Sequence, residues 1–498
     1  MNFKYFIVIL AIVQLSLIIG TCVGQEQQLT QTTLFVDPTS TTNSTQGCGA
    51  TSTQACPTIS AAIASYSVII PEPTNSLLNI VLAPGVYTPM YNSTSNQYGN
   101  AQLVLSGLNV TIGPSTPLAQ GSQVIIDLLQ PNTNISNMFI TLAVSADQSP
   151  MTIVTLSNLN IVHANTVIRS NNNNANIVLN NVTITGFMSN SSGAIYLTDN
   201  ERGNISSLTI NGGSISNYTC APYTTLVNSF QYNMVINDAV FANNSAAYII
   251  YGYNASFTFQ TPTFINNTVT NNLIYFKDFG RDLISTITDG NIAYNQLAGV
   301  TNFNGLIASS GGSVSITGTL FDSNSHLYSL LQMSFADLTI QGSTFISNVV
   351  YDGQVIGGEG SIFEMSESAM FNNVMFDSVA INFNLSHISL SNVVFGKQLG
   401  PLGVNNTVIM CTQGNITFDQ ITNYNNQSGN GGLMACGVTS QCSISGDTQV
   451  CNHEPDQHKG LSGGAIAGIV FGTLIGVAAI AVIIVLIHKR RRNQYNSI

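Results

Sequence analysis

Apolar residues recur along the middle of the chain in pairs five positions apart, and an asparagine often follows three positions later. Ile316-Thr-Gly-Thr-Leu-Phe321-Asp-Ser-Asn324 is a clear example. The pairs are Leu82/Tyr87, Leu105/Val110, Leu156/Ile161, Leu179/Ile184, Ile210/Ile215, Ile236/Phe241, Phe259/Phe264, Ile287/Ile292, Ile316/Phe321, Ile340/Phe345, Phe371/Phe376 and Leu390/Phe395, with a weaker copy at Phe418/Asn423. From Leu156 onward the repeat averages about 26 residues, which predicts a stack of similar units.

Each repeat also alternates apolar and polar residues, as in Val314-Ser-Ile316 and Leu338-Thr-Ile340. This alternation is typical of strands that bury one face. The segment between the two apolar ends of the chain shows no long amphipathic helix. A propeller blade needs about 40 residues, and a leucine-rich repeat needs its own leucine spacing. We therefore predict an all-β fold, a right-handed parallel β-helix with three short strands per coil and asparagine side chains stacked in its turns.

Several motifs resemble those of known β-helical proteins. The Phe-x-x-Asn motifs at Phe241, Phe264, Phe321 and Phe345, with Ser192-Gly-Ala-Ile195, resemble the repeats of chlamydial polymorphic membrane proteins, which are adhesins. Residues 56–63 and 79–87 resemble the opening of pectin-lyase-like proteins, which implies a capping helix and then a first coil. The Asn-rich single-pass chain is also similar to surface proteins of social amoebae. The resemblance covers roughly residues 33–430 and specifies the fold better than the function.

The two ends of the chain predict a single-pass membrane protein. Residues 1–24 combine Lys4, an apolar run and small residues before Gly24, which is the pattern of a cleaved signal peptide. An uncleaved signal anchor is the alternative. Residues 464–487 are 24 uncharged residues, enough to cross a bilayer, and the basic tail at 488–498 is expected in the cytoplasm. The β-helix is then expected over 25–430 of a lumenal or extracellular ectodomain, followed by a cysteine-containing segment over 431–463.

The ectodomain is acidic although only 7% of the chain is charged. All 22 acidic residues lie between Glu26 and Asp456, and the ectodomain contains six basic residues, so it carries a net charge of −16 and the tail +4. A nucleic-acid binder needs a basic surface, so we expect no nucleic-acid partner, and polyanionic ligands are disfavoured. No motif predicts a cofactor.

The predicted ectodomain contains fifteen Asn-x-Ser/Thr sequons, which support a secretory route. We expect several, but not all, to carry glycans because some must be buried in the stack. The sequons are Asn43, Asn92, Asn109, Asn134, Asn181, Asn190, Asn204, Asn217, Asn243, Asn254, Asn266, Asn384, Asn405, Asn415 and Asn426.

Seven cysteines remain after the predicted signal peptide. Cys48 and Cys56 predict a small disulfide loop in an oxidising compartment. Cys220 predicts a free buried thiol, with an intermolecular disulfide as the alternative. Two more disulfides of open pairing are expected before the membrane, since the spacing of a zinc site is missing; these cysteines are Cys411, Cys436, Cys442 and Cys451.

The sequence contains no complete catalytic pattern. Glycoside hydrolysis needs paired carboxylates, and the adjacent Asp pairs, Gly-His-Gly and Arg-x-Lys of polygalacturonases are missing. Asp278, Arg281 and Asp282 are weak catalytic candidates, although a solvated loop with an internal salt bridge explains them as well. The weak candidates for a calcium site match no known calcium-loop spacing; they are Asp352, Glu359, Glu364 and Glu367. His163, His326 and His387 fit turn or ladder positions better than metal ligation.

Three further patterns suggest interactions. No sequon lies between Asn266 and Asn384, which suggests a glycan-free face for a protein or carbohydrate ligand, although chance explains the gap equally well. Glycines recur every four residues in the predicted span and suggest a homodimer through one helix face; they are Gly464, Gly468, Gly472 and Gly476. Tyr495 and Ile498 match a Tyr-x-x-Φ endocytic sorting signal.

We therefore expect a non-catalytic type I membrane glycoprotein of the plasma membrane or an endolysosomal membrane. Its ectodomain would serve adhesion, recognition or a surface coat. A membrane-tethered polysaccharide lyase or glycoside hydrolase is the first alternative, and an endolysosomal sorting receptor is the second. A strand face with a cleft of clustered carboxylates and a base would favour the enzyme, whereas a smooth face of asparagine and threonine would favour binding.

Overall fold

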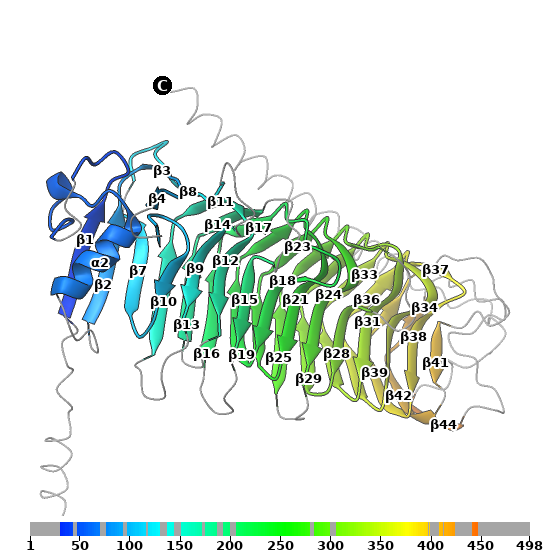
Figure 1. Cartoon of the computed structure of the whole chain (residues 1–498). Helices are drawn as coiled ribbons and strands as arrows, with labels where there is room; N and C mark the ends of the chain where they lie inside the picture. Colours follow the sequence, from blue (N-terminus) through cyan, green and yellow to red (C-terminus); the bar gives the residue numbers. More distant parts are fainter. Residues whose placement is uncertain are drawn as a thin grey trace, which may run out of the picture. The chain divides into compact units, whose positions relative to one another are not determined.

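The computed structural model describes much of the chain as a stack of parallel strands (Figure 1). The described residues are 30–42, 47–69, 76–92, 97–115, 118–129, 137–143, 151–171, 175–186, 193–199, 206–278, 283–298, 305–396, 398, 408–411, 413–423 and 441–446. The chain divides into two units, Met1–Cys451 and Asn452–Ile498, and all described residues belong to the first. Within them, no helix has both the length and the apolar character needed to span a membrane. The predicted signal peptide, membrane span and tail, with their glycine and sorting motifs, lie outside the described residues.

Over the described residues, nearly all strands belong to three long sheets. Sheet 1 contains β1 (Thr30–Val36), β2 (Ser76–Leu82), β7 (Asn109–Pro114), β10 (Thr152–Ser157), β13 (Ala175–Asn180), β16 (Ser206–Asn211), β19 (Tyr232–Asn237), β22 (Phe257–Gln260), β25 (Ile284–Thr288), β29 (Ser313–Thr317), β32 (Asp337–Gln341), β35 (Ile362–Ser366), β39 (Ser386–Ser391), β42 (Gln413–Asp419) and β44 (Gln441–Gly446). Sheet 2 contains β3 (Gly85–Tyr87), β8 (Val124–Asp127), β11 (Asn160–Ala164), β14 (Thr183–Gly186), β17 (Ser214–Ser216), β20 (Val240–Ala242), β23 (Thr263–Ile265), β26 (Asn291–Ala293), β30 (Leu320–Asp322), β33 (Thr344–Ile346), β36 (Ala369–Phe371), β40 (Val394–Phe395) and β43 (Thr422–Asn423).

Sheet 3 completes each coil. It contains β6 (Leu103–Leu105), β9 (Met138–Leu142), β12 (Thr166–Ser170), β15 (Ile195–Thr198), β18 (Thr225–Phe230), β21 (Ser245–Tyr253), β24 (Thr268–Lys277), β28 (Gly305–Ser310), β31 (Leu327–Ser334), β34 (Val349–Glu359), β38 (Val379–Asn384) and β41 (Ile409–Cys411), with β27 (Gln296–Leu297) on β24 and β37 (Val374–Phe376) on β34. A separate antiparallel pair joins β4 (Tyr91–Asn92) to β5 (Gln97–Tyr98). The described chain is therefore an all-β parallel solenoid built from three sheets, which confirms this part of the predicted fold.

The repeated apolar residues form columns inside the stack. Each lies beside its counterpart on the next coil, as the parallel register of Leu156, Leu179 and Ile210 shows. Stacking removes these side chains from water, and such burial is the main favourable term in folding. The aromatic members also stack on one another, with ring centroids 4.9 Å apart for Phe241 and Phe264. This explains the Phe in the Phe-x-x-Asn motif.

Three of the predicted pairs are out of register. The inner column of sheet 1 passes through Ile80 and Ile112, so Leu82 and the pair Leu105/Val110 were assigned wrongly. Farther along, Met365 and Met370 occupy the inner positions that were assigned to Phe371 and Phe376. The error arose because Phe371 and Phe376 have the same five-residue spacing as a true pair, although Phe371 follows the buried Met370 and is itself only half-buried.

The corners explain why the chain is rich in asparagine and glycine. Between sheets 1 and 2, most coils have one residue with a positive φ, and the coil at Gly212 and Gly213 has two. This left-handed conformation is least costly for glycine, asparagine and aspartate. These residues include Asn158, Asn181, Gly212, Asp238, Asp289, Gly318, Gly342 and Asn392. The corner between sheets 2 and 3 also contains residues with a positive φ, namely Asn217, Asn243, Asn266, Tyr294, Ser323, Ser347 and Asn372.

A ladder of buried asparagines follows the second of these corners. It runs through Asn244, Asn267, Asn295, Asn324, Asn348 and Asn373, each at most 1% exposed, and ends on Gln398. The Nδ2 of Asn324 donates to Oδ1 of Asn348 at 2.9 Å and to the carbonyl of Ile292 at 2.8 Å. Its Oδ1 accepts the backbone N–H and the Nδ2 of Asn295, both at 3.0 Å. The ladder therefore satisfies buried amides completely and confirms the predicted stacking of asparagine.

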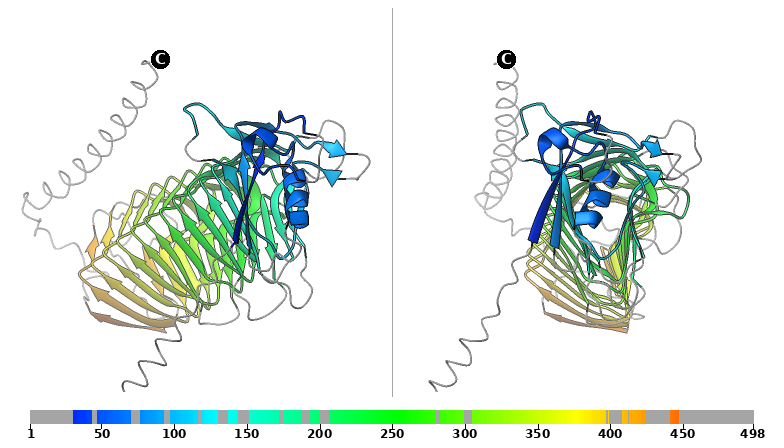
Figure 2. Two further views of the ribbon diagram at one scale, coloured as in Figure 1. Left: turned by 90° about the vertical axis from the view of Figure 1, so that its left-hand side faces the viewer. Right: turned by 60° about the vertical axis from the view of Figure 1, so that its left-hand side comes forward.

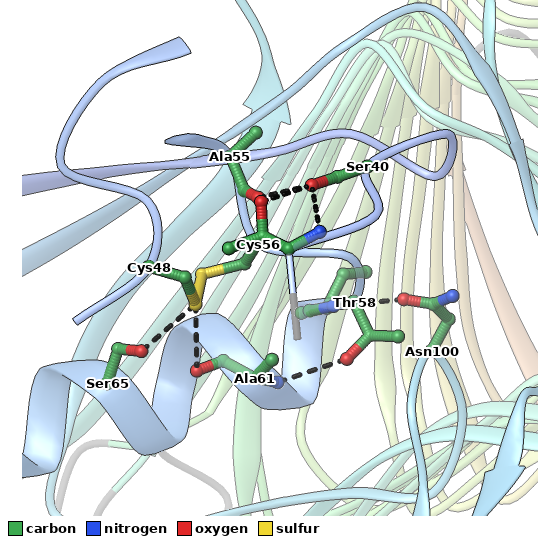
Figure 3. Close-up of a disulfide and its surroundings, with 10 residues drawn as sticks. Ser40, Cys48, Ala55, Cys56, Thr58, Ala61, Ser65 and Asn100 are labelled. Atoms are coloured by element: carbon green, nitrogen blue, oxygen red, sulfur yellow. Dashed lines mark hydrogen bonds between the residues drawn. A yellow bond between two sulfur atoms is a disulfide. The ribbon is translucent and has the colours of Figure 1, made fainter. Parts of the chain in front are cut away.

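The N-terminal end of the stack is covered by α2 (Ile59–Ile69), as the resemblance to pectin-lyase-like proteins implied (Figure 2). The side-chain oxygen of Thr58 caps this helix by accepting the N–H of Ala61 at 3.1 Å. Asn100 accepts the N–H of Ile59 at 2.9 Å. The Cys48–Cys56 disulfide closes a small loop next to this helix (Figure 3). A turn of 3₁₀ helix, η1 (Ser52–Gln54), lies in this loop. The predicted disulfide is confirmed.

We predict that Asn324→Ala destabilises the solenoid by about 3 kcal/mol, because it leaves the N–H groups of Asn295 and the carbonyl of Ile292 buried without partners. Thr339→Ala, on the exposed face of sheet 1, should change the free energy of unfolding by less than about 0.5 kcal/mol. Urea denaturation of the two variants measures the difference. Equal losses would contradict a special role for the ladder.

We also predict that stability falls in alkali. Burial, opposed in part by its hydrogen bond with Ser170, raises the pKa of Tyr232 to about 12. The unfolded chain ionises this hydroxyl near pH 10, so stability is intact below about pH 10 and is lost as pH rises toward 12, by about 1.4 kcal/mol per pH unit for this group. Urea denaturation between pH 9 and 12 measures the slope. Tyr232→Phe should reduce it, whereas Tyr223→Phe, at a residue 87% exposed, should not.

Candidate functional site

The outward face of sheet 1 carries mostly neutral polar groups. One outward column runs through Thr209, Val235, Thr258, Thr286, Ser315 and Thr339. In the column beside it, Asn237 donates to Asn211 at 2.8 Å and Asn211 donates to Asn180 at 2.9 Å. Over β13 to β29 the face is therefore lined by hydroxyl and amide groups, the kind of surface that the binding hypothesis predicted.

Ionisable residues gather on the same sheet farther along the stack. Asp337, Glu364 and His387 lie on the neighbouring strands β32, β35 and β39 and face outward. The Oδ1 of Asp337 accepts the N–H of Ile362 at 3.1 Å. These three residues line neither of the two cavities described below, a groove of about 460 Å³ and a cavity of about 10 Å³. Two carboxylates and a base therefore lie on one face of the sheet, but neither described cavity surrounds them.

A group of aromatic side chains lies on the outward face of sheet 3. In one column the register aligns Arg169, Tyr196, Asn228, Tyr251 and Tyr275 on successive coils. The adjacent column aligns Thr198, Phe230, Tyr253 and Lys277. Tyr248, in the first half of β21, completes the group. We define the tyrosine platform as Tyr196, Phe230, Tyr248, Tyr251, Tyr253 and Tyr275; all six side chains are half-buried.

Five of the six rings contact another ring of the platform, in one pair and one group of three. Phe230 and Tyr253 stack with centroids 4.3 Å apart, and Tyr251 lies 5.3 Å from Tyr248 and 5.6 Å from Tyr275. Burial, followed by the neighbouring hydroxyls of Tyr275 and Tyr248, raises the pKa of Tyr251. Burial likewise raises the pKa of Tyr275, although a hydrogen bond with Ser310 partly offsets this increase. These hydroxyls therefore stay protonated at neutral pH, and each can donate and accept a hydrogen bond.

Cations border the platform. The guanidinium carbon of Arg169 lies 5.8 Å from the centroid of the Tyr196 ring, within the range of a cation–π contact. Lys277 follows Tyr253 in its column. The next residue, Asp278, is the described member of the catalytic candidates; it borders the cavity of about 10 Å³, which has room for about one water. Arg281 and Asp282 lie outside the described residues.

The acidic residues considered for calcium are dispersed. Asp352 and Glu359 lie on β34 of sheet 3, Glu364 lies on β35 of sheet 1, and Glu367 occupies the corner after it. Glu367 accepts a hydrogen bond from Gln341 at 3.4 Å. Among the residues that the structure describes, no three His, Cys, Asp or Glu side chains converge as metal ligands would.

The contact between His163 and Asp127 was not predicted from the sequence. The Nδ1 of His163 lies 2.8 Å from Oδ1 of Asp127, and the two residues are 36 positions apart. His163 lies within β11 at a β-bulge, where it has a positive φ, and not in a turn. The register that places Val162 beside Asp127 brings the pair together. Only an alignment of β8 with β11 could have predicted it.

Cysteines and sequons occupy varied positions. Cys220 is free, and burial raises the pKa of its thiol to about 12, so the thiol is unreactive at neutral pH. Cys411 and Cys442 lie in β41 and β44, but their side chains, like Cys436 and Cys451, lie outside the described residues. The exposed sequon asparagines among the described residues are Asn181, Asn217, Asn243, Asn266 and Asn415, whereas Asn109, Asn254 and Asn384 are half-buried.

Comparison with known proteins finds structural similarity at low sequence identity. No protein-family model and no curated protein matches the chain. Tailspike protein 3 of bacteriophage CBA120 is similar in structure, at 12% identity and a TM-score of 0.38, over 80% of this chain and 60% of the tailspike. The GH136 lacto-N-biosidase from Eubacterium ramulus is similar at 9% identity and a TM-score of 0.27, over 83% of this chain and 67% of the enzyme. The chain thus spans less than two thirds of the tailspike, and similarities this low carry no argument about function.

Proposed function

We propose that the chain is a type I single-pass membrane glycoprotein whose solenoid binds a neutral carbohydrate, without catalysis, in adhesion or recognition. The observation that supports this proposal best is the tyrosine platform on sheet 3. Contacting aromatic rings on three neighbouring strands, β18, β21 and β24, present an apolar surface edged by hydroxyl groups. Ligand sites commonly combine apolar and aromatic side chains with a few placed polar groups.

The chemistry of the platform suits a sugar. The apolar face of a pyranose ring can pack on an aromatic ring, while its hydroxyls exchange hydrogen bonds with the phenols of Tyr251 and Tyr275 and the amide of Asn228. Neighbouring strands lie about 4.8 Å apart, so an oligosaccharide lying along the stack would meet a new side chain at each coil. Arg169 and Lys277 would add hydrogen-bond donors at the edges.

The hydrolase alternative depends on the two carboxylates and the histidine of sheet 1. Acid and base catalysis by paired carboxylates requires a substrate held between them. Because Asp337 and Glu364 line neither described cavity, the proposal assigns them no catalytic role. The sorting-receptor alternative depends on Tyr495 and Ile498, and it stays a prediction.

We predict that Tyr251→Ala combined with Tyr275→Ala lowers the affinity of the ectodomain, residues 25–463, for its carbohydrate ligand at least tenfold. A tenfold loss corresponds to about 1.4 kcal/mol, a modest cost for two aromatic contacts. Glycan-array binding identifies the ligand, and titration of each variant measures its affinity. Tyr294→Ala removes a tyrosine that is 54% exposed outside the platform and serves as the matched control.

Two outcomes would contradict the proposal. Binding that survives the double substitution but is abolished by Thr258→Lys with Thr286→Lys would place the ligand on sheet 1. Release of sugar from a bound oligosaccharide, lost in Glu364→Gln, would favour the hydrolase. For the membrane part of the proposal, the full chain should resist alkaline extraction from membranes, and a chain that ends at residue 463 should be secreted.

A further inference from the structure

A groove of about 460 Å³ lies at the corner between sheets 1 and 2 near the N-terminal end of the stack. Its apolar lining includes Pro114, Leu118 and Leu159, and its polar lining includes Asn158, Asn160 and Thr183. The described residues that line it include no ionisable side chain. Pockets for small ligands commonly measure about 300–1,000 Å³, so this groove has room for about one or two sugar rings.

A glycosylation sequon opens directly into this groove. Asn181 and Thr183, the first and third residues of Asn181-Val-Thr183, both line it, while Val182 between them is 3% exposed and points into the core. Asn181 is exposed and has a φ of +51°, and Thr183 begins β14. The corner conformation therefore presents the acceptor amide at the groove.

The polar groups of the groove match a linked sugar. The Nδ2 of Asn181 donates to Oδ1 of Asn158 at 3.0 Å. Glycosylation replaces one of the two Nδ2 hydrogens, so the other can keep this bond. Asn160 lies on the adjacent strand, beside Thr183 in the register, and its Oδ1 is buried without a hydrogen-bond partner. A buried acceptor of this kind needs a donor, and a sugar hydroxyl or acetamido N–H can supply one.

We infer that the first sugar of an N-glycan on Asn181 lies in this groove, packs on Leu118 and Leu159, and donates a hydrogen bond to Asn160. The inference depends on the proposed secretory route, because only there is the glycan added. Asn217, Asn243 and Asn266 have the same positive φ and are exposed, but they line neither described cavity. Their glycans are expected to extend into solvent.

The test compares rates of glycan release from the full chain expressed in a eukaryotic secretory system. Under native conditions an endoglycosidase should release the Asn181 glycan at least tenfold more slowly than the Asn243 glycan, as followed by mass spectrometry of glycopeptides. After denaturation the two rates should be equal. Asn160→Ala should accelerate release at Asn181 under native conditions and leave release at Asn243 unchanged, which shows that the fold is intact.

Several results would overturn the inference. Equal native rates at Asn181 and Asn243, or no acceleration in Asn160→Ala, would show that the groove does not hold the glycan. An unmodified Asn181 in a chain that is glycosylated at Asn243 would overturn the inference and leave the secretory route intact. A chain with no glycan at any sequon would overturn both this inference and the proposed function.

Discussion

A buried asparagine is tolerated only where protein groups replace the hydrogen bonds that its amide would make with water. That condition governs the part of the solenoid that contains the ladder, from Asn244 to Gln398. The Oδ1 of Asn324 takes two donors from the coil before it, and its Nδ2 reaches one coil in each direction. A shift of one residue between coils would break all of these bonds. The ladder therefore fixes the register, and the register in turn fixes which side chains form columns inside and outside the stack.

The sequence predicted the inner columns because their spacing is nearly constant. The two members of each correctly predicted pair lie on sheets 1 and 2, on either side of a short corner with one or two residues of positive φ, so five positions separate them in almost every coil. The prediction failed where Phe371 and Phe376, which are outside the inner columns, have the same five-residue spacing as the inner pair Met365 and Met370. A pattern search cannot distinguish an outward phenylalanine from an inward methionine; only the pairing of the strands does so.

The tyrosine platform could not be predicted for a related reason. Sheet 3 contains the variation in coil length: its strands vary from two residues in β27 to eleven in β34, and its register shifts between Ala246 and Tyr248. Tyr196, Tyr251 and Tyr275 therefore recur at unequal intervals, and no fixed period aligns them. Because strand length and register vary in sheet 3, its side chains can change with little effect on the ladder. This variability suits a binding surface.

The corners also account for the interval without sequons. In Asn243-Asn-Ser245 and Asn266-Asn-Thr268, the first asparagine takes the positive φ and is exposed, the second joins the buried ladder, and the hydroxyl residue begins the strand of sheet 3. Coils with Tyr294, Ser323 or Ser347 at the corner keep the ladder but lose the acceptor, and the corner at Asn372 lacks the hydroxyl because Val374 follows. The interval without sequons therefore reflects which residue occupies the corner, and the ladder is present in either case. Sequons at this corner can be gained or lost while the solenoid itself stays the same.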